Sequence, residues 1–451
     1  MNRSSPAVAV TRRPGWPAVS AFAVLVLAAL AGCSQQSSRD LQPGIYRATV
    51  ELPGEKRVPF GLDVAQDEQG KVLYVVNGEE RIRLDGLQLA PGTLEVRFPG
   101  YETVLQARVA GDELTGEVRL PHAAGKVIKL PFKATLGEGW RFFPESLPNN
   151  ADFAGRWSVT FDGTSEPRLT GVALLDQSFE RVAGTVQLPD ADQRYLAGEA
   201  HDEELKLSRF DGGAVVLYEG KLDAQGRLVG TLWTDRDSPR SFVATRNPDA
   251  TIEPVALATR LRNPLEPFRF SFRDLDGSAV SSDDPRFKGQ PLLLTLAGSW
   301  CPNSHDEARL LAALDRKYRD RGLRIVSLMF EQHADFDRAA RAVQRFRAAT
   351  GIRHATLIAG EADKARASAA LPQLDGVVAY PTVLFIDRAG LVRAIHTGFA
   401  GPATGVHYDV LARDFELQIE KLLGTPPAAP ASAASADVGA ATPATVSPGS
   451  S

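Results

Sequence analysis

The chain has 451 residues, too many for one ordinary hydrophobic core, so two or three domains are expected. Hydrophobic residues make up 43% and charged residues 24%, which excludes a largely disordered chain and a long coiled coil. The formal net charge of −4 argues against nucleic acid as a partner.

Residues 1–32 have a basic start, an apolar run and small residues before Cys33. This pattern predicts a secretory signal peptide, because the apolar run is too short to span a membrane. Leu30-Ala31-Gly32-Cys33 resembles the lipobox of bacterial lipoproteins, which implies cleavage before Cys33 and its acylation, palmitate included. Ser34 resembles the outer-membrane sorting pattern, so a periplasm-facing anchor in the cell envelope is expected. The alternative is an ordinary signal peptide with an unrelated cysteine.

Residues 33–40 are expected to form a polar tether. In residues 41–137, short runs alternate apolar and polar side chains between turn residues, which predicts an antiparallel β-module. A second β-module is predicted over residues 151–247. Each module is expected to close as a sandwich or small barrel, because an open sheet must bury its apolar face.

The two β-modules share a repeated pattern. The run GIYRATV at 44–50 is echoed by GRWSVTF at 155–161, and FKAT at 132–135 is echoed by FVAT at 242–245. Because the spacing between these landmarks is kept, we predict that the modules are related structural repeats.

Residues 265–424 change to strands that alternate with helices, the pattern of an α/β domain. PLLLTLAGSW predicts a buried central strand, followed by an amphipathic helix. Near the end of the domain, YPTVLFIDRAGLVRAIHTGFAG predicts a hairpin with its turn at 387–390. Residues 425–451 are rich in Pro, Ala, Ser and Thr, and we expect them to be a disordered tail.

The chain has two cysteines, Cys33 and Cys301. If Cys33 carries lipid, Cys301 is the remaining thiol, and an intrachain disulfide is excluded. Cys301 precedes a helix expected to start at Pro302, so its sulfur would face unpaired backbone N–H groups and the positive end of the helix dipole. This placement is expected to lower the thiol pKa, and the resulting thiolate can attack a disulfide or a sulfenate.

Trp300-Cys301-Pro302, Tyr380-Pro381-Thr382 and the hairpin together resemble the thioredoxin fold and, within it, the exported TlpA-like thiol-disulfide oxidoreductases. The resemblance implies a cis peptide bond before Pro381, with nearby backbone presented to a substrate. It implies a site built from Trp300, Cys301, Pro302, Ser304, Pro381 and Thr382.

The sequence departs from these families at three positions. Ser304 stands where the second cysteine would be, and Thr295 stands where thioredoxins often bury a carboxylate. Gly298 stands where peroxiredoxins have a threonine, which argues against an efficient peroxidase. Without a resolving thiol or an internal proton acceptor, ordinary dithiol reduction is not expected from one molecule.

Two functions of different classes follow from these residues. In the first, Cys301 attacks a mixed disulfide or sulfenic acid of an exported protein, Ser304 hydrogen-bonds the thiolate, and an external thiol or reductase completes the cycle without a bound cofactor. This chemistry suits monothiol reduction, isomerisation or deglutathionylation. In the second, the thioredoxin-like domain is inactive, and the lipoprotein binds or scaffolds other envelope components through its β-modules.

Other site classes find little support in the sequence. The seven histidines are scattered without metal-ligand spacing, and no phosphate-binding GxxxxGK[ST] loop or GxSxG elbow occurs. Asn303 and His305 are candidates for tuning Cys301, although a histidine in the first helical turn is expected to be exposed. Asp306 and Glu307 are expected in the first turn of this helix, where negative charge is favourable for the dipole, and a capping role is preferred to a catalytic one.

Overall fold

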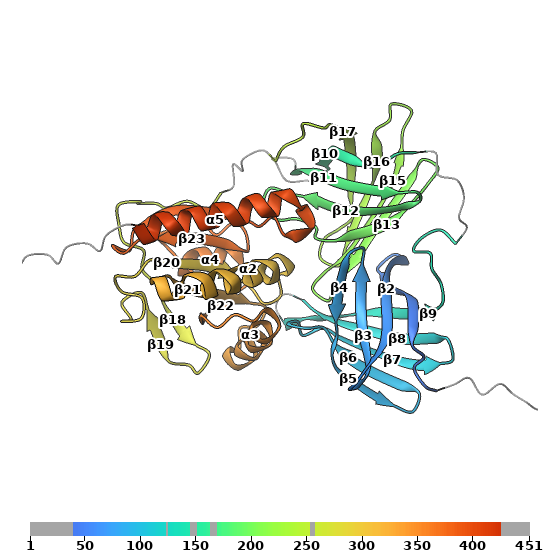
Figure 1. The fold of residues 1–451 in the computed structure, drawn as a ribbon, viewed down its shortest axis with the longest axis horizontal. Coiled ribbons are helices and arrows are strands. Elements are labelled where there is room, and N and C mark those ends of the chain that lie inside the picture. Colours follow the sequence, from blue (N-terminus) through green and yellow to red (C-terminus); the bar gives the residue numbers. More distant parts are fainter. Residues whose placement is uncertain (1–38, 123–124, 145–150, 163–168, 253–257, 425–451) are drawn as a thin grey trace, which may run out of the picture.

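The computed structural model describes residues 39–122, 125–144, 151–162, 169–252 and 258–424. The expected signal peptide, the acylation site at Cys33 and the tail at 425–451 lie outside these described residues. Two antiparallel β-sheets are followed by an α/β unit (Figure 1), which confirms the predicted fold class. Among the described helices, none has the length and apolar character that crossing a membrane requires.

The first module is a nine-stranded antiparallel sheet in the order β4-β3-β2-β1-β9-β8-β7-β6-β5. Its alternation is clear in the first strand, where Tyr46, Ala48 and Val50 are buried and the residues between them are partly exposed. The strands are β1 (Gly44–Leu52), β2 (Lys56–Asp67), β3 (Gly70–Asn77), β4 (Glu80–Arg83), β5 (Asp85–Ala90), β6 (Thr93–Arg97), β7 (Val104–Ala110), β8 (Glu113–Pro121) and β9 (Val127–Leu136).

The second module is a closed antiparallel barrel in which the first strand pairs with the last. Its strands are β10 (Gly155–Phe161), β11 (Leu169–Ser178), β12 (Arg181–Gln187), β13 (Leu196–His201), β14 (Glu204–Phe210), β15 (Val215–Leu222), β16 (Leu228–Thr234) and β17 (Arg240–Arg246). Phe161 pairs with Phe242, as Val50 pairs with Phe132 in the first module. The repeated sequence landmarks therefore occupy equivalent positions, which supports the predicted structural repeat.

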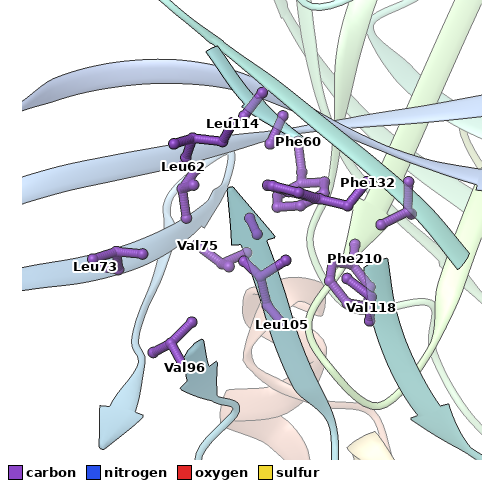
Figure 2. Packing of buried hydrophobic residues seen from close by; sticks show 14 of the residues in the cluster. Phe60, Leu62, Leu73, Val75, Val96, Leu105, Leu114, Val118, Phe132 and Phe210 are labelled. Carbon is purple, nitrogen blue, oxygen red and sulfur yellow. The ribbon is translucent and has the colours of Figure 1, made fainter. Parts of the chain in front are cut away.

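The two β-modules share a hydrophobic core. Phe210, at the end of β14, lies among the buried side chains of the first module (Figure 2). Its ring meets those of Phe60 and Phe98 edge to face, with centroids 5.0 and 4.9 Å apart. Because Val215 and Leu217 of β15 join the same cluster, part of the second module completes the core of the first.

The α/β unit has a seven-stranded sheet in the order β19-β18-β22-β21-β20-β23-β24. Strands β20, β21 and β22 are parallel, whereas β23 is antiparallel to β20 and forms the predicted hairpin with β24. The strands are β18 (Ser271–Asp274), β19 (Ala279–Ser281), β20 (Leu292–Ala297), β21 (Arg324–Glu331), β22 (Ala355–Glu361), β23 (Thr382–Ile386) and β24 (Val392–Thr397). The α-helices are α2 (Pro302–Tyr318), α3 (Phe336–Thr350), α4 (Lys364–Ala370) and α5 (Val406–Gly424).

The central strand β20 is buried on both faces. Leu293 packs with apolar residues of α2 and α5, whereas Leu292 and Leu294 belong to the opposite cluster, which includes Ala367 of α4. A strand that is covered on both faces has apolar residues at successive positions, as in the sequence PLLLTL. The strand therefore delivers the residues that follow it to a fixed position at one end of the sheet.

Candidate functional site

Cys301 lies at the turn between β20 and α2, as the sequence predicted. It is the N-cap residue, in an extended conformation, and Pro302 is the first residue of the helix. The Cys301 backbone N–H donates to the carbonyl oxygen of Gly298 at 3.1 Å. The thiol is free, and the residue is only 8% exposed.

The loop before β23 lies directly beside this cysteine. The Tyr380–Pro381 peptide bond is cis, as the resemblance implied. The Cys301 thiol donates to the carbonyl oxygen of Tyr380, with 3.4 Å between sulfur and oxygen. Thr382 is fully buried, and its hydroxyl donates to the carbonyl oxygen of Ala379 at 2.9 Å, so its side chain holds the loop together.

Trp300 is fixed next to the same loop. Its indole N–H donates to the carbonyl oxygen of Phe330 at 2.9 Å, and its ring meets that of Tyr380 edge to face at 5.8 Å. A Cβ atom at Gly298 would lie 2.3 Å from the indole nitrogen. The indole therefore occupies the space that a threonine at Gly298 would need.

Ser304 is fully buried below Cys301, and its hydroxyl accepts a hydrogen bond from the Gly298 N–H at 3.4 Å. Burial nevertheless raises the pKa of Cys301, although the Ser304 backbone and hydroxyl and the Asn303 N–H act in the opposite direction. The expectation of a lowered pKa is therefore wrong. The cause is desolvation, because an apolar environment disfavours the thiolate more than the helix terminus favours it.

Glu307, further along α2 than Cys301, has a carboxyl group whose burial the sequence analysis did not foresee. Glu307 is 1% exposed, and the Thr295 hydroxyl donates to its Oε2 at 2.6 Å. Burial raises the pKa of Glu307 to about 8. Glu307 therefore lies beyond the first turn of α2 as a buried acid bonded to Thr295, so the expected capping role in that turn is wrong. The sequence did contain a signal for this burial, because the spacing of Glu307 from Ser304 and Leu311 places all three residues on one face of the helix.

A second buried carboxyl group comes from the neighbouring strand β21. The Oε1 atom of Glu331 accepts from the Ser299 N–H at 2.9 Å, and Oε2 accepts from the Ser299 hydroxyl at 2.6 Å. Burial raises the pKa of Glu331 to about 7. No local motif marks this residue, because its partner lies 32 positions earlier in the chain.

His305 is buried between units, so its expected exposure is wrong. Its ring stacks on that of Tyr101 from the first β-module, with centroids 4.2 Å apart, and it meets Phe346 edge to face. Its Nε2 atom lies 2.8 Å from the carbonyl oxygen of Ser299. Burial lowers the pKa of His305 to about 3, so the ring is neutral and packs the interface.

The barrel also contacts the first turns of α2. The Asn303 amide donates to Asp192 at 3.3 Å, and the Gly401 N–H donates to the same carboxylate oxygen. Asp306 pairs with Arg194 at 2.8 Å and with Arg309 at 2.9 Å. Asp306 lies beyond the first turn of α2, so the expected capping role is wrong, and its carboxylate instead holds the barrel against the helix.

The structure brings Trp300, Cys301, Pro302, Ser304 and Pro381 together around one sulfur atom. No cluster of His, Cys, Asp and Glu that could hold a metal ion occurs in the parts of the chain that the structure describes. The strand order, the cis bond before Pro381 and the cysteine at the helix terminus define the C-terminal unit as a thioredoxin-like domain with a single cysteine.

Residues 261–407 match the Redoxin family, and this match covers less than half of the chain. No curated protein matches the chain. Solved structures similar to the C-terminal region include a thiol:disulfide interchange protein of the thioredoxin family from Chlorobium tepidum, with 20% identity over 36% of this chain and 98% of that chain, and a TM-score of 0.28.

Two further solved structures match the C-terminal region with comparable identity and coverage. One is a secreted Mycobacterium tuberculosis disulfide oxidoreductase, with 17% identity over 34% of this chain and 96% of that chain, and a TM-score of 0.25. The other is a thiol-disulfide oxidoreductase from Bacteroides fragilis, with 17% identity over 32% of this chain and 96% of that chain, and a TM-score of 0.24.

Proposed function

We propose that this chain is an envelope-anchored thiol-disulfide oxidoreductase that acts through one nucleophile, Cys301. The observation that carries the proposal is the position of the sulfur, at the N-terminus of α2 and 3.4 Å from the Tyr380 carbonyl oxygen beside Pro381. Ser304 supports it, since its hydroxyl and N–H favour the thiolate and cannot form a disulfide.

The proposed reaction is an exchange of disulfides. The Cys301 thiolate attacks one sulfur of a substrate disulfide, forms a mixed disulfide, and displaces the other sulfur as a thiolate, which takes up a proton from solvent. An external thiol then attacks the mixed disulfide, releases Cys301, and leaves as a new disulfide. With a sulfenic acid as substrate, the first step forms the same mixed disulfide and releases water.

We expect the lipidated protein in detergent to form a mixed disulfide with glutathione when it is treated with excess glutathione disulfide. Intact-protein mass spectrometry should find the adduct in the wild type and none in Cys301→Ser, because the folded protein then has no thiol to exchange. An unmodified native wild type, with an adduct after denaturation, would overturn the proposal. It would favour the alternative function below.

The variant Ser304→Cys provides a matched gain of function in the same assay. A thiol at position 304 is placed to attack the Cys301 adduct, so the glutathione adduct should disappear and an internal disulfide should replace it. A persistent adduct in Ser304→Cys would show that Ser304 does not occupy the resolving position.

The alternative function is that of a binding or scaffolding lipoprotein whose thioredoxin-like domain no longer turns over. The observation that favours it is the burial of Cys301 together with its raised pKa, since both disfavour a reactive thiolate. Exported proteins with oxidised cysteines would be partners under the first proposal, and the β-modules would bind the partner under the second.

The envelope anchor is proposed from Cys33 and the residues before it. Cells fed labelled palmitate should incorporate label into the wild-type chain, and Cys33→Ala should lose it because the acylated thiol is gone. Cys301→Ala is the matched control and should keep the label. An unlabelled wild type, or label retained in Cys33→Ala, would contradict acylation at this residue.

A further inference from the structure

One arginine of the β-barrel reaches the candidate site. Arg236 lies in the loop between β16 and β17, and its Nη2 atom donates to the carbonyl oxygen of Gly213 at 2.7 Å. The same nitrogen lies 3.4 Å from the carbonyl oxygen of Trp300, which belongs to the peptide bond leading into Cys301. The guanidinium carbon is 5.2 Å from the centre of the Trp300 ring.

The position of Arg236 is fixed by its surroundings in the barrel. Its acceptor, Gly213, lies in a turn where a Cβ atom would come within 2.6 Å of the Tyr101 ring. The N–H of Gly213 donates to Asp211 at 2.9 Å. The N–H of Arg236 donates to the Thr234 hydroxyl at 3.4 Å, so the base of its loop is also held.

We propose that Arg236 is a positioning residue of the Cys301 site. Its side chain holds the Trp300 carbonyl in place, and its guanidinium charge stabilises the Cys301 thiolate. The proposal rests on the function proposed above and deepens it, because it makes the site a composite of the thioredoxin-like domain and the barrel. The charge of Arg236 lowers the pKa of Cys301 from outside the domain, in addition to the groups of Ser304 and Asn303 on α2. Opposite charges within several ångströms have this effect when water is excluded.

Other ionisable groups also face this region. Tyr380 lies on the loop before β23, Glu331 accepts hydrogen bonds from Ser299, and Asp235 lies 3.5 Å from the Arg236 side chain. The pKa of Glu331 is raised to about 7 by burial, so it titrates within the pH range of thiol assays. A test must therefore compare variants that keep all three of these groups.

The test is the rate of Cys301 alkylation by iodoacetamide against pH, in the full-length protein and in Arg236→Gln and Arg236→Lys. We expect Arg236→Gln to move the midpoint to higher pH and to slow alkylation at neutral pH by about tenfold for each pKa unit of displacement. Arg236→Lys keeps the charge and should stay close to the wild type. Arg240→Gln, a partly exposed arginine at the start of β17 that pairs with Asp237, is the matched control and should not move the midpoint.

An unchanged midpoint in Arg236→Gln would overturn the proposal. Equal displacement in Arg236→Gln and Arg236→Lys would also overturn it, because it would indicate a purely structural contact. Alkylation reports the thiolate whether or not disulfide exchange occurs. A wild type that is alkylated but forms no glutathione adduct would therefore reject the proposed function without affecting the assignment of Arg236.

Discussion

Replacing Arg194 with alanine should lower the free energy of unfolding by about 3–5 kcal/mol, the usual cost of removing one partner from a buried ionic cluster. The Arg194 side chain is 5% exposed and pairs with Asp211 at 2.6 Å, Glu80 at 2.6 Å and Asp306 at 2.8 Å. These carboxylates come from the barrel, the first β-module and α2, so one side chain joins the three units. Without it, the carboxylates remain buried with less compensating charge.

The matched control is Arg309→Ala, because Arg309 also pairs with Asp306, at 2.9 Å, but its side chain is 49% exposed. Exposed pairs contribute at most about 1 kcal/mol. Urea unfolding followed by circular dichroism should separate the two variants, and Arg194→Lys should fall between the wild type and Arg194→Ala, since lysine keeps the charge without the planar fork. Equal losses in Arg194→Ala and Arg309→Ala would contradict a central role for Arg194.

The second large effect concerns the pH dependence of stability at Glu307. Its ordinary pKa is 4.5 and burial raises it to about 8 in the folded protein, so between these values the folded state holds a proton that the unfolded state loses. Stability therefore falls as pH rises through this window, by about 3 kcal/mol between pH 5 and pH 8. Glu307→Gln removes this contribution while it keeps an acceptor for the Thr295 hydroxyl.

The measurement is a set of urea unfolding curves at several pH values for the wild type, Glu307→Gln and Glu416→Gln. Glu416 is a partly exposed carboxylate on α5 that pairs with Lys317, and its variant should follow the wild-type pH dependence. The stability gained by Glu307→Gln should grow towards pH 8. Burial also raises the pKa of Glu331 to about 7 and that of Asp192 to about 6, so some slope of the same sign should remain. Parallel curves for the wild type and Glu307→Gln would show that Glu307 is not buried as a neutral acid.

The contacts between the β-modules and the start of α2 bear on both proposed functions. Asn303, His305 and Asp306 follow the cysteine on α2, and each contacts a residue of a β-module. Cys301 itself packs in a hydrophobic cluster of the thioredoxin-like domain, so the β-modules contact residues that flank the cysteine on α2.

Local sequence patterns were sufficient for the outline of the fold. Alternation of apolar and polar residues predicted the two β-modules, and the repeated landmarks predicted their equivalent strands, because pairing register follows the period of a strand. The continuous apolar run before Cys301 predicted a central strand, and Pro302 predicted where the helix begins. These features depend on residues that are close together in the chain.

The electrostatics of the site were decided by contacts that no local pattern contains. The pKa of Cys301 is raised although a helix terminus lies beside it, because the thiol is buried in a hydrophobic cluster whose members are far apart in the chain. Three of these contacts join α2 or the residue before Cys301 to a β-module: His305 stacks on Tyr101, Asp306 pairs with Arg194, and the Trp300 carbonyl accepts from Arg236. The sequence determined which groups are present and which elements carry them, whereas the packing of three units determined which groups are buried, and burial sets the cost of charge.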